Sequence, residues 1–77
     1  MITLEEGNKE MTPYVRVEIE TGICWFTYWY EVHHWSEEEQ CWYHDWEEDN
    51  GGFGLWFVLK KARKALHKKW FELLEEK

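Results

Sequence analysis

The chain has 77 residues, of which 44% are hydrophobic and 32% charged, with seven tryptophans and a net charge of −7. This length fits one domain over residues 1–77, and the sequence has no run of about 18 apolar residues that could span a membrane. The acidic start MITLEEGNKE lacks the apolar core of a secretion signal, and two cysteines are too few for a disulfide framework, so we predict a cytoplasmic protein with Cys24 and Cys41 as buried thiols beside tryptophans.

The first predicted strand follows a polar segment. Residues 1–12 are polar and lack periodicity, so we predict a loose N-terminal arm or a short extra strand. Residues 14–21, YVRVEIET, alternate apolar and charged side chains, which indicates a strand with one buried face. Thr21-Gly22 then supplies a turn.

Residues 23–34 form the second predicted strand, and this strand is apolar on both faces. Trp29 belongs to one face, whereas Tyr28 and Tyr30 belong to the other. A strand that is buried on both faces is usually central in its sheet. Because one helix covers only one face of a small sheet, the second aromatic face needs another cover, and large exposed apolar patches mark interaction sites.

The next segment supports two interpretations. Ser36 and Glu39 match a capping box that could open a short helix. The alternation in CWYHDW, residues 41–46, instead favours a third strand after a hairpin loop, and we predict the strand. Residues 14–47 are then the β-rich part, and residues 48–52, EDNGG, predict a turn.

The last segment is predicted as a helix over residues 57–76. Its apolar residues recur at helical spacing along one narrow stripe: Leu55, Leu59, Ala62, Leu66, Trp70 and Leu73. The fold class is therefore α+β, with an antiparallel sheet of three to four strands and one C-terminal helix packed across one face.

Candidate catalytic and metal-binding residues do not form a known pattern. Cys24, His33, His34, Cys41 and His44 are zinc-binding residue types, but only Cys41 and His44 have a tight spacing. The adjacent His33 and His34 point to opposite faces of a strand. The Cys41–His44 pair lacks a third group that would orient the histidine for catalysis. We therefore predict no metal, no cofactor and no enzymatic activity.

Charge is divided unevenly along the chain. Residues 1–52 carry 13 acidic and 2 basic side chains, whereas residues 53–77 carry 3 and 7. An acidic body can dock on a basic protein surface. In size, in acidity and in lacking catalytic motifs, the chain resembles the small inhibitors that phages use against host nucleases, anti-CRISPR proteins among them.

We therefore predict a non-enzymatic protein–protein interaction, in which an acidic, nucleic-acid-mimicking surface blocks a basic site on a host nuclease or effector complex. A homodimer is the other way to cover the aromatic face. The predicted partner-binding residues are Tyr28, Tyr30, Glu37, Glu38, Glu39, Trp42, Trp46, Glu47, Glu48 and Asp49. For the four aromatic residues, their alternates on the other face of the same strands are the other possibility.

The alternative function is nucleic-acid binding by the basic helix. KKARKAL after a β-rich body resembles the last helix of a double-stranded-RNA-binding domain, although the first helix of that family is absent. This interpretation assigns nucleic-acid contacts to Lys60, Lys61, Lys64 and Lys68. The acidic body would repel a phosphate backbone, so we expect protein rather than nucleic acid as the partner.

Overall fold

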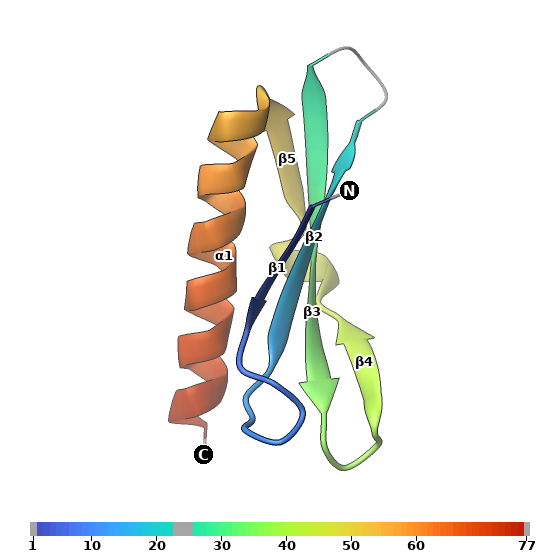
Figure 1. The fold of residues 1–77 in the computed structure, drawn as a ribbon, viewed down its shortest axis with the longest axis vertical. Coiled ribbons are helices and arrows are strands. Elements are labelled where there is room, and N and C mark those ends of the chain that lie inside the picture. The colour runs from blue at the N-terminus through green and yellow to red at the C-terminus, as the bar shows by residue number, and fades with distance from the viewer. Residues whose placement is uncertain (1, 23–25, 77) are drawn as a thin grey trace.

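The computed structural model describes residues 2–22 and 26–76 of the chain and has an α+β fold (Figure 1). One five-stranded antiparallel sheet and one long C-terminal helix make up the described part. The elements in chain order are β1 (Ile2–Glu6), β2 (Val15–Thr21), β3 (Thr27–Ser36), β4 (Cys41–His44), the 3-10 helix η1 (Trp46–Glu48), β5 (Asn50–Phe53) and α1 (Leu55–Glu75). The predicted fold class is confirmed.

The long strand β3 is the centre of the sheet, as the sequence predicted. On one side it pairs with β2, which in turn pairs with β1. On its other side the first half of β3 pairs with β5 and the second half pairs with β4. The N-terminal arm therefore contributes an extra strand, the second of the two alternatives that the sequence left open.

Helix α1 covers one face of the sheet, and the core lies between them (Figure 1). The strands contribute Val15, Val17, Ile19, Tyr30 and Val32, and the helix contributes Val58, Ala62, Ala65 and Leu66. The alternation in β2 thus points its valines and isoleucine at the helix and leaves its charged residues on the other face. Burial of these apolar side chains is the main force that holds the helix on the sheet.

The helix begins at Leu55, slightly before the predicted start at residue 57. Gly54 has a φ of +81°, which glycine adopts without steric cost, and this residue turns the chain from β5 into the helix. The Val58 N–H donates to the Gly54 carbonyl oxygen at 3.1 Å, which closes the first turn.

The region around β4 agrees with the strand prediction. Residues 37–40 form the turn between β3 and β4, and β4 then pairs with residues 33–36. The prediction that Cys41 is buried is wrong, because the Cys41 side chain is exposed on this short edge strand. The matching prediction for Cys24 lies outside the described residues.

The predicted turn over residues 48–52 is only partly correct. The 3-10 helix η1 makes the change of direction, and Gly51 and Gly52 belong to β5. At Gly51 a Cβ atom would lie 2.6 Å from the Tyr28 carbonyl oxygen and 3.1 Å from Cε3 of Trp29. The glycine is therefore needed for the close approach of β5 to β3, and not for a turn.

No helix in the described ranges is long and apolar enough to cross a membrane.

Candidate functional site

The face of the sheet that α1 leaves uncovered is the candidate functional site, and we call it the open face. Its side chains alternate with those of the core, and cross-strand partners lie on the same face of an antiparallel pair. The pairing therefore places the following residues on the open face: Arg16, Glu18, Glu20, Thr27, Trp29, Glu31, His33, Trp35, Trp42, His44 and Phe53.

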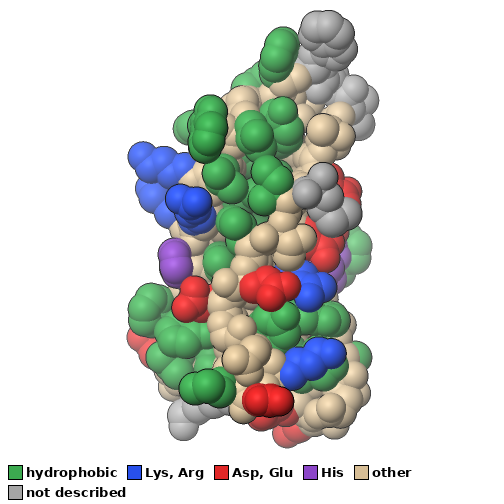
Figure 2. Space-filling model, viewed as in Figure 1, with side chains coloured by type: hydrophobic (Ala, Val, Ile, Leu, Met, Phe, Trp, Pro, Cys, Tyr) green, Lys and Arg blue, Asp and Glu red, His purple; other side chains and the backbone are tan. Residues whose placement is uncertain are grey.

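Exposed aromatic side chains gather where β3 begins and β5 ends. Trp29 is 45% exposed and Phe53 72% exposed on the open face. Other exposed aromatic residues, next to these two in the chain, extend this surface around the end of the sheet to the start of α1. Figure 2 shows hydrophobic side chains over the upper half of the molecule, which holds the start of α1, and further ones over the lower half. We call this surface the aromatic end; its residues are Phe26, Trp29, Phe53, Trp56 and Phe57.

The backbone explains why these aromatic residues lie together. Residues 27 and 53 are cross-strand partners, and the Gly54 N–H donates to the Phe26 carbonyl oxygen at 2.7 Å. A Cβ at Gly52 would lie 3.4 Å from Cδ1 of Phe57, so the helix start lies directly against β5. The short strand β5 thus joins the start of β3 to the start of α1.

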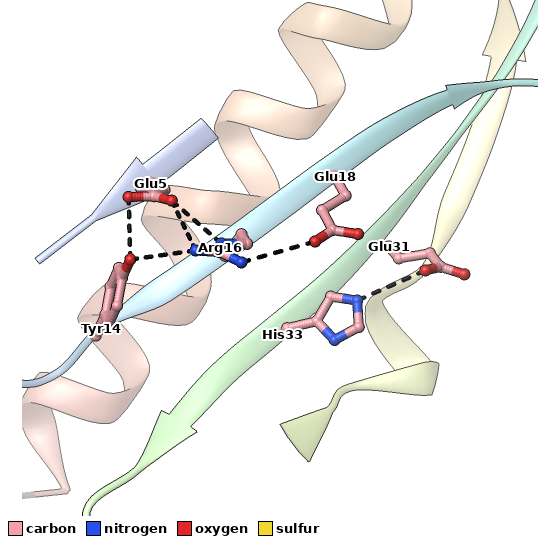
Figure 3. Close-up of polar contacts among 6 residues, drawn as sticks. All are labelled: Glu5, Tyr14, Arg16, Glu18, Glu31 and His33. Carbon is pink, nitrogen blue, oxygen red and sulfur yellow. Dashed lines mark hydrogen bonds and ion pairs between the residues drawn. The ribbon is translucent and has the colours of Figure 1, made fainter. Parts of the chain in front are cut away.

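A group of polar side chains surrounds Arg16 at the other side of the open face (Figure 3). The Arg16 guanidinium lies 3.0 Å from Glu5 and 3.9 Å from Glu18, and the Tyr14 hydroxyl donates to Glu5 at 3.0 Å. Burial alone would lower the pKa of Arg16, but the hydrogen bond to Tyr14 and the charge of Glu5 outweigh burial and raise that pKa. Arg16 is therefore held in a network and remains charged.

The same guanidinium packs over an aromatic cluster. Arg16 lies 4.6 Å from the centre of the Trp42 ring, and Trp42 meets Tyr14 and Trp35 edge-on at 4.7 and 5.5 Å. Lys9 lies 4.5 Å from the Trp35 ring centre in a second cation–π contact. Arg16 and Lys9 thus partly cover this aromatic cluster. At the aromatic end, Lys61 lies 5.6 Å from the centre of the Phe57 ring.

Two histidines and a glutamate lie on the open face between the Arg16 network and the aromatic end. His33 and His44 are cross-strand partners, and their rings stack with centroids 4.4 Å apart. Nε2 of His33 lies 3.6 Å from Oε1 of Glu31. Figure 3 shows these two side chains directed toward each other. Nε2 of His44 bonds Oδ2 of Asp49 at 2.5 Å, and the other oxygen of Asp49 accepts the Val32 N–H at 3.0 Å.

His33 and His34 lie on opposite faces, as the strand geometry predicted. Nδ1 of His34 bonds Oδ2 of Asp45 at 2.7 Å, and Lys69 reaches Oδ1 of Asp45 at 3.3 Å. His34 is therefore linked through Asp45 to Lys69 on α1, and its side chain is not on the open face.

The structure separates the four aromatic residues that the sequence assigned to partner binding. Tyr30 is only 5% exposed, because it lies in the core beneath α1, and Tyr28 packs against the same core. Tyr30 is therefore not available as a docking surface, whereas Tyr28 is only partly buried. Trp42 is half-buried on the open face, whereas Trp46 is 74% exposed on η1.

The predicted acidic residues lie at the two ends of β4, as the sequence indicated. Glu37, Glu38 and Glu39 are exposed in the turn before β4. After β4, Glu47 is exposed and Glu48 lies 3.7 Å from Lys68, but the Asp49 side chain is 5% exposed and bonded internally. Asp49 is therefore a structural residue rather than a docking residue.

The most exposed part of the open face was not assigned from the sequence. Trp29 was covered only by the alternative that the other face of the strand meets the partner. Phe53 and the acidic residues of β2 were missed, because the choice between the two faces of the sheet was not settled. The usable signal was the strict alternation of β2, whose charged side chains identify the face away from the helix.

Two of the four lysines predicted for nucleic-acid binding are engaged within the protein. Lys61 donates to the Gly51 carbonyl oxygen at 3.0 Å, and Lys68 lies 3.7 Å from Glu48 and 3.9 Å from Glu72. Lys60 and Lys64 are exposed on the outer surface of α1. The basic surface is thus narrower than the sequence suggested.

No protein-family model matches the chain, and comparisons with curated proteins and with solved structures find no significant match.

Proposed function

We propose that this protein is a non-enzymatic binding protein whose open face and aromatic end dock on a basic surface of another protein. The observation that carries the proposal is that Trp29 and Phe53 are exposed on the same face as Glu18, Glu20 and Glu31. Tryptophan and other aromatic residues supply much of the binding energy of protein interfaces when they fill a partner's pocket.

The charge of this face favours a basic partner. Glu18 and Glu31 are cross-strand partners, as are Glu20 and Trp29, so carboxylates lie beside the exposed tryptophan. Arg16 is tied to Glu5 and Glu18 and does not neutralise the whole face. Complementary charge speeds association and selects partners, while the aromatic contacts supply affinity.

A different protein fits this surface better than a second copy of the chain. A twofold dimer through the open face would bring the acidic patch of one copy, Glu18, Glu20 and Glu31, close to the same patch of the other. The net charge of −7 adds to this repulsion. In its sharpest form the proposal is an inhibitor that occupies a basic, nucleic-acid-binding site on a nuclease or effector complex in the cytoplasm.

Nucleic-acid binding by α1 is the second candidate. Lys60, Arg63 and Lys64 are exposed on the helix, on the side of the molecule away from the acidic face. Three cations on one helix are few for a phosphate-backbone site, which typically uses about six to ten contacts. This candidate predicts affinity for duplex RNA or DNA that falls with salt.

The test compares three variants in affinity capture from a host lysate at low and high salt. Trp29→Thr with Phe53→Thr removes the aromatic contacts, and Glu18→Gln with Glu20→Gln removes two charges. Both are expected to lose the captured partner, and that partner should be a basic protein that binds less tightly at high salt.

Lys60→Gln with Lys64→Gln is the matched control, because it removes two charges from the opposite side of the molecule. The proposal predicts that this variant keeps the partner. Loss of binding in the lysine variant alone, with nuclease-sensitive capture, would refute the proposal in favour of nucleic-acid binding.

A further inference from the structure

We infer that Glu31, His33 and His44 form a binding site for a divalent transition-metal cation of the zinc type on the open face. Each side chain offers one ligand atom, and these three atoms lie within 4.8 Å of one another. Two imidazoles and a carboxylate form a donor set that zinc accepts, with a fourth position left for water. This site does not include the aromatic end, but it lies on the same open face and shares Glu31 with the proposed docking surface.

The first argument is an unsatisfied nitrogen. Nε2 of His33 is buried and has no hydrogen-bond partner among the described residues, since Oε1 of Glu31 lies 3.6 Å away. Buried polar atoms are nearly always bonded, so an exception needs a physical explanation. A cation between His33 and Glu31 would satisfy the nitrogen and hold the carboxylate.

The second argument is the orientation of His44. The carboxylate of Asp49 accepts from Nε2 of His44 at 2.5 Å, and it is itself fixed by the Val32 N–H. This bond places the ring proton on Nε2 and leaves Nδ1 with a free lone pair. A carboxylate behind the imidazole is the usual arrangement at zinc-binding histidines, where it orients the ring and raises its basicity.

The surrounding charge also favours a cation. Glu18 is the cross-strand partner of Glu31, so a second carboxylate lies next to the site. Arg16 is the cross-strand partner of His33, but its charge is directed toward Glu5 and Glu18 at 3.0 and 3.9 Å. In Figure 3 the His33 ring is directed toward Glu31, and Arg16 lies with Glu5 and Glu18.

Small side-chain movements would complete the site. Tetrahedral zinc with bonds of about 2.0–2.1 Å places its ligand atoms about 3.3 Å apart. The atoms of His33 and Glu31 are already near that spacing, and the stacked rings of His33 and His44 must tilt to converge on one ion. Tilting of His44 would also change its contact with Trp46, whose ring centroid lies 3.8 Å away.

The test is titration of the purified chain with Zn²⁺ and with Co²⁺. Binding is measured by calorimetry, and the histidines involved are identified by long-range ¹H–¹⁵N spectra of the imidazoles. We expect one bound ion per chain, with resonance changes confined to His33 and His44. His33→Gln and Glu31→Gln should each weaken binding about tenfold or more, because loss of even an outer hydrogen-bond partner weakens metal sites by about 10–100-fold.

His67→Gln is the control, because His67 is exposed on α1 and should leave binding unchanged. The inference is overturned if no ion binds at one equivalent, or if binding is equal in wild type and His33→Gln. It is also overturned if His34 or His67 shows the main resonance changes. His33→Gln replaces a largely buried ring and could prevent folding. In that case Glu31→Gln alone tests the site.

Discussion

Replacement of Asp49 by alanine should remove a large part of the stability of this fold. The Asp49 side chain is 5% exposed, and it joins η1 to the centre of the sheet through the Val32 N–H and the His44 ring. Asp49→Ala deletes both contacts and leaves a buried N–H without an acceptor. Asp49→Asn keeps an acceptor for Val32 but places an amide group against His44.

The size of the expected stability loss follows from the bonds of Asp49 to the Val32 N–H and to the His44 ring. Hydrogen bonds to charged groups contribute about 1.5–3 kcal/mol each, so Asp49→Ala should lower the free energy of unfolding by about 3–6 kcal/mol. A domain of this length has a total stability of about 4–12 kcal/mol, so the variant should be close to unfolding at room temperature. Asp49→Asn should lose about 1–2 kcal/mol, because both bonds lose their charge assistance while Val32 keeps an acceptor.

The losses of unfolding free energy in Asp49→Ala and Asp49→Asn are measured by urea unfolding in the presence of a chelator, monitored by tryptophan fluorescence. Glu47→Ala is the control, because Glu47 is exposed on the same 3-10 helix and should change stability by less than about 0.5 kcal/mol. If Asp49→Ala is as stable as Glu47→Ala, the carboxylate does not hold η1 to the sheet, and the argument for an oriented His44 fails with it.

Three further predictions concern the fold. Trp70→Phe should lower the free energy of unfolding by about 1 kcal/mol in urea, because the indole N–H donates to the Pro13 carbonyl oxygen at 3.0 Å and the variant leaves that oxygen unpaired. Gly51→Ala should cost about 1–3 kcal/mol in the same assay, because the new Cβ would lie 2.6 Å from the Tyr28 carbonyl oxygen; an unchanged urea midpoint would show that β5 is free to move. Burial, aided by Glu48 and Asp49, raises the pKa of Tyr30, so the neutral phenol is favoured in the folded state. Stability should therefore be retained below pH of about 10 and fall as pH rises through the folded pKa, and Tyr30→Phe should remove this alkaline loss; an identical alkaline loss in wild type and variant would contradict the assignment.

Much of the fold could be predicted because its elements carry strong local patterns. The strict alternation of β2 and the helical spacing of Leu59, Ala62 and Leu66 each indicate one element type and one buried face. The central position of β3 followed from its apolar character on both sides. These signals depend only on neighbouring residues in the chain.

The errors arose where tertiary contacts decide the outcome. Gly51 and Gly52 have the composition of a turn, but their missing side chains allow β5 to approach β3 closely. Cys41 was expected to be buried because it adjoins a tryptophan, yet it lies on a short edge strand where its side chain is exposed.

The residues of the open face were predicted only in part. The sequence predicted an aromatic, acidic surface, and the described residues place Trp42 but not Tyr30 on the face that α1 leaves uncovered. The assignment to Tyr30 failed because only the packing of α1 decides which face of β3 is covered. The spatial meeting of Glu31, His33 and His44 depends on the register of β3 with β4, which the sequence does not specify.

The solution mass at low and at high salt tests the central claim most directly, because the claim requires the open face to be uncovered in the free protein. Light scattering on a sizing column should give the 9.6 kDa monomer at both salt concentrations. A stable dimer at both, reduced to a monomer by Trp29→Thr with Phe53→Thr, would show that a second copy covers this face and would contradict docking on a foreign basic protein.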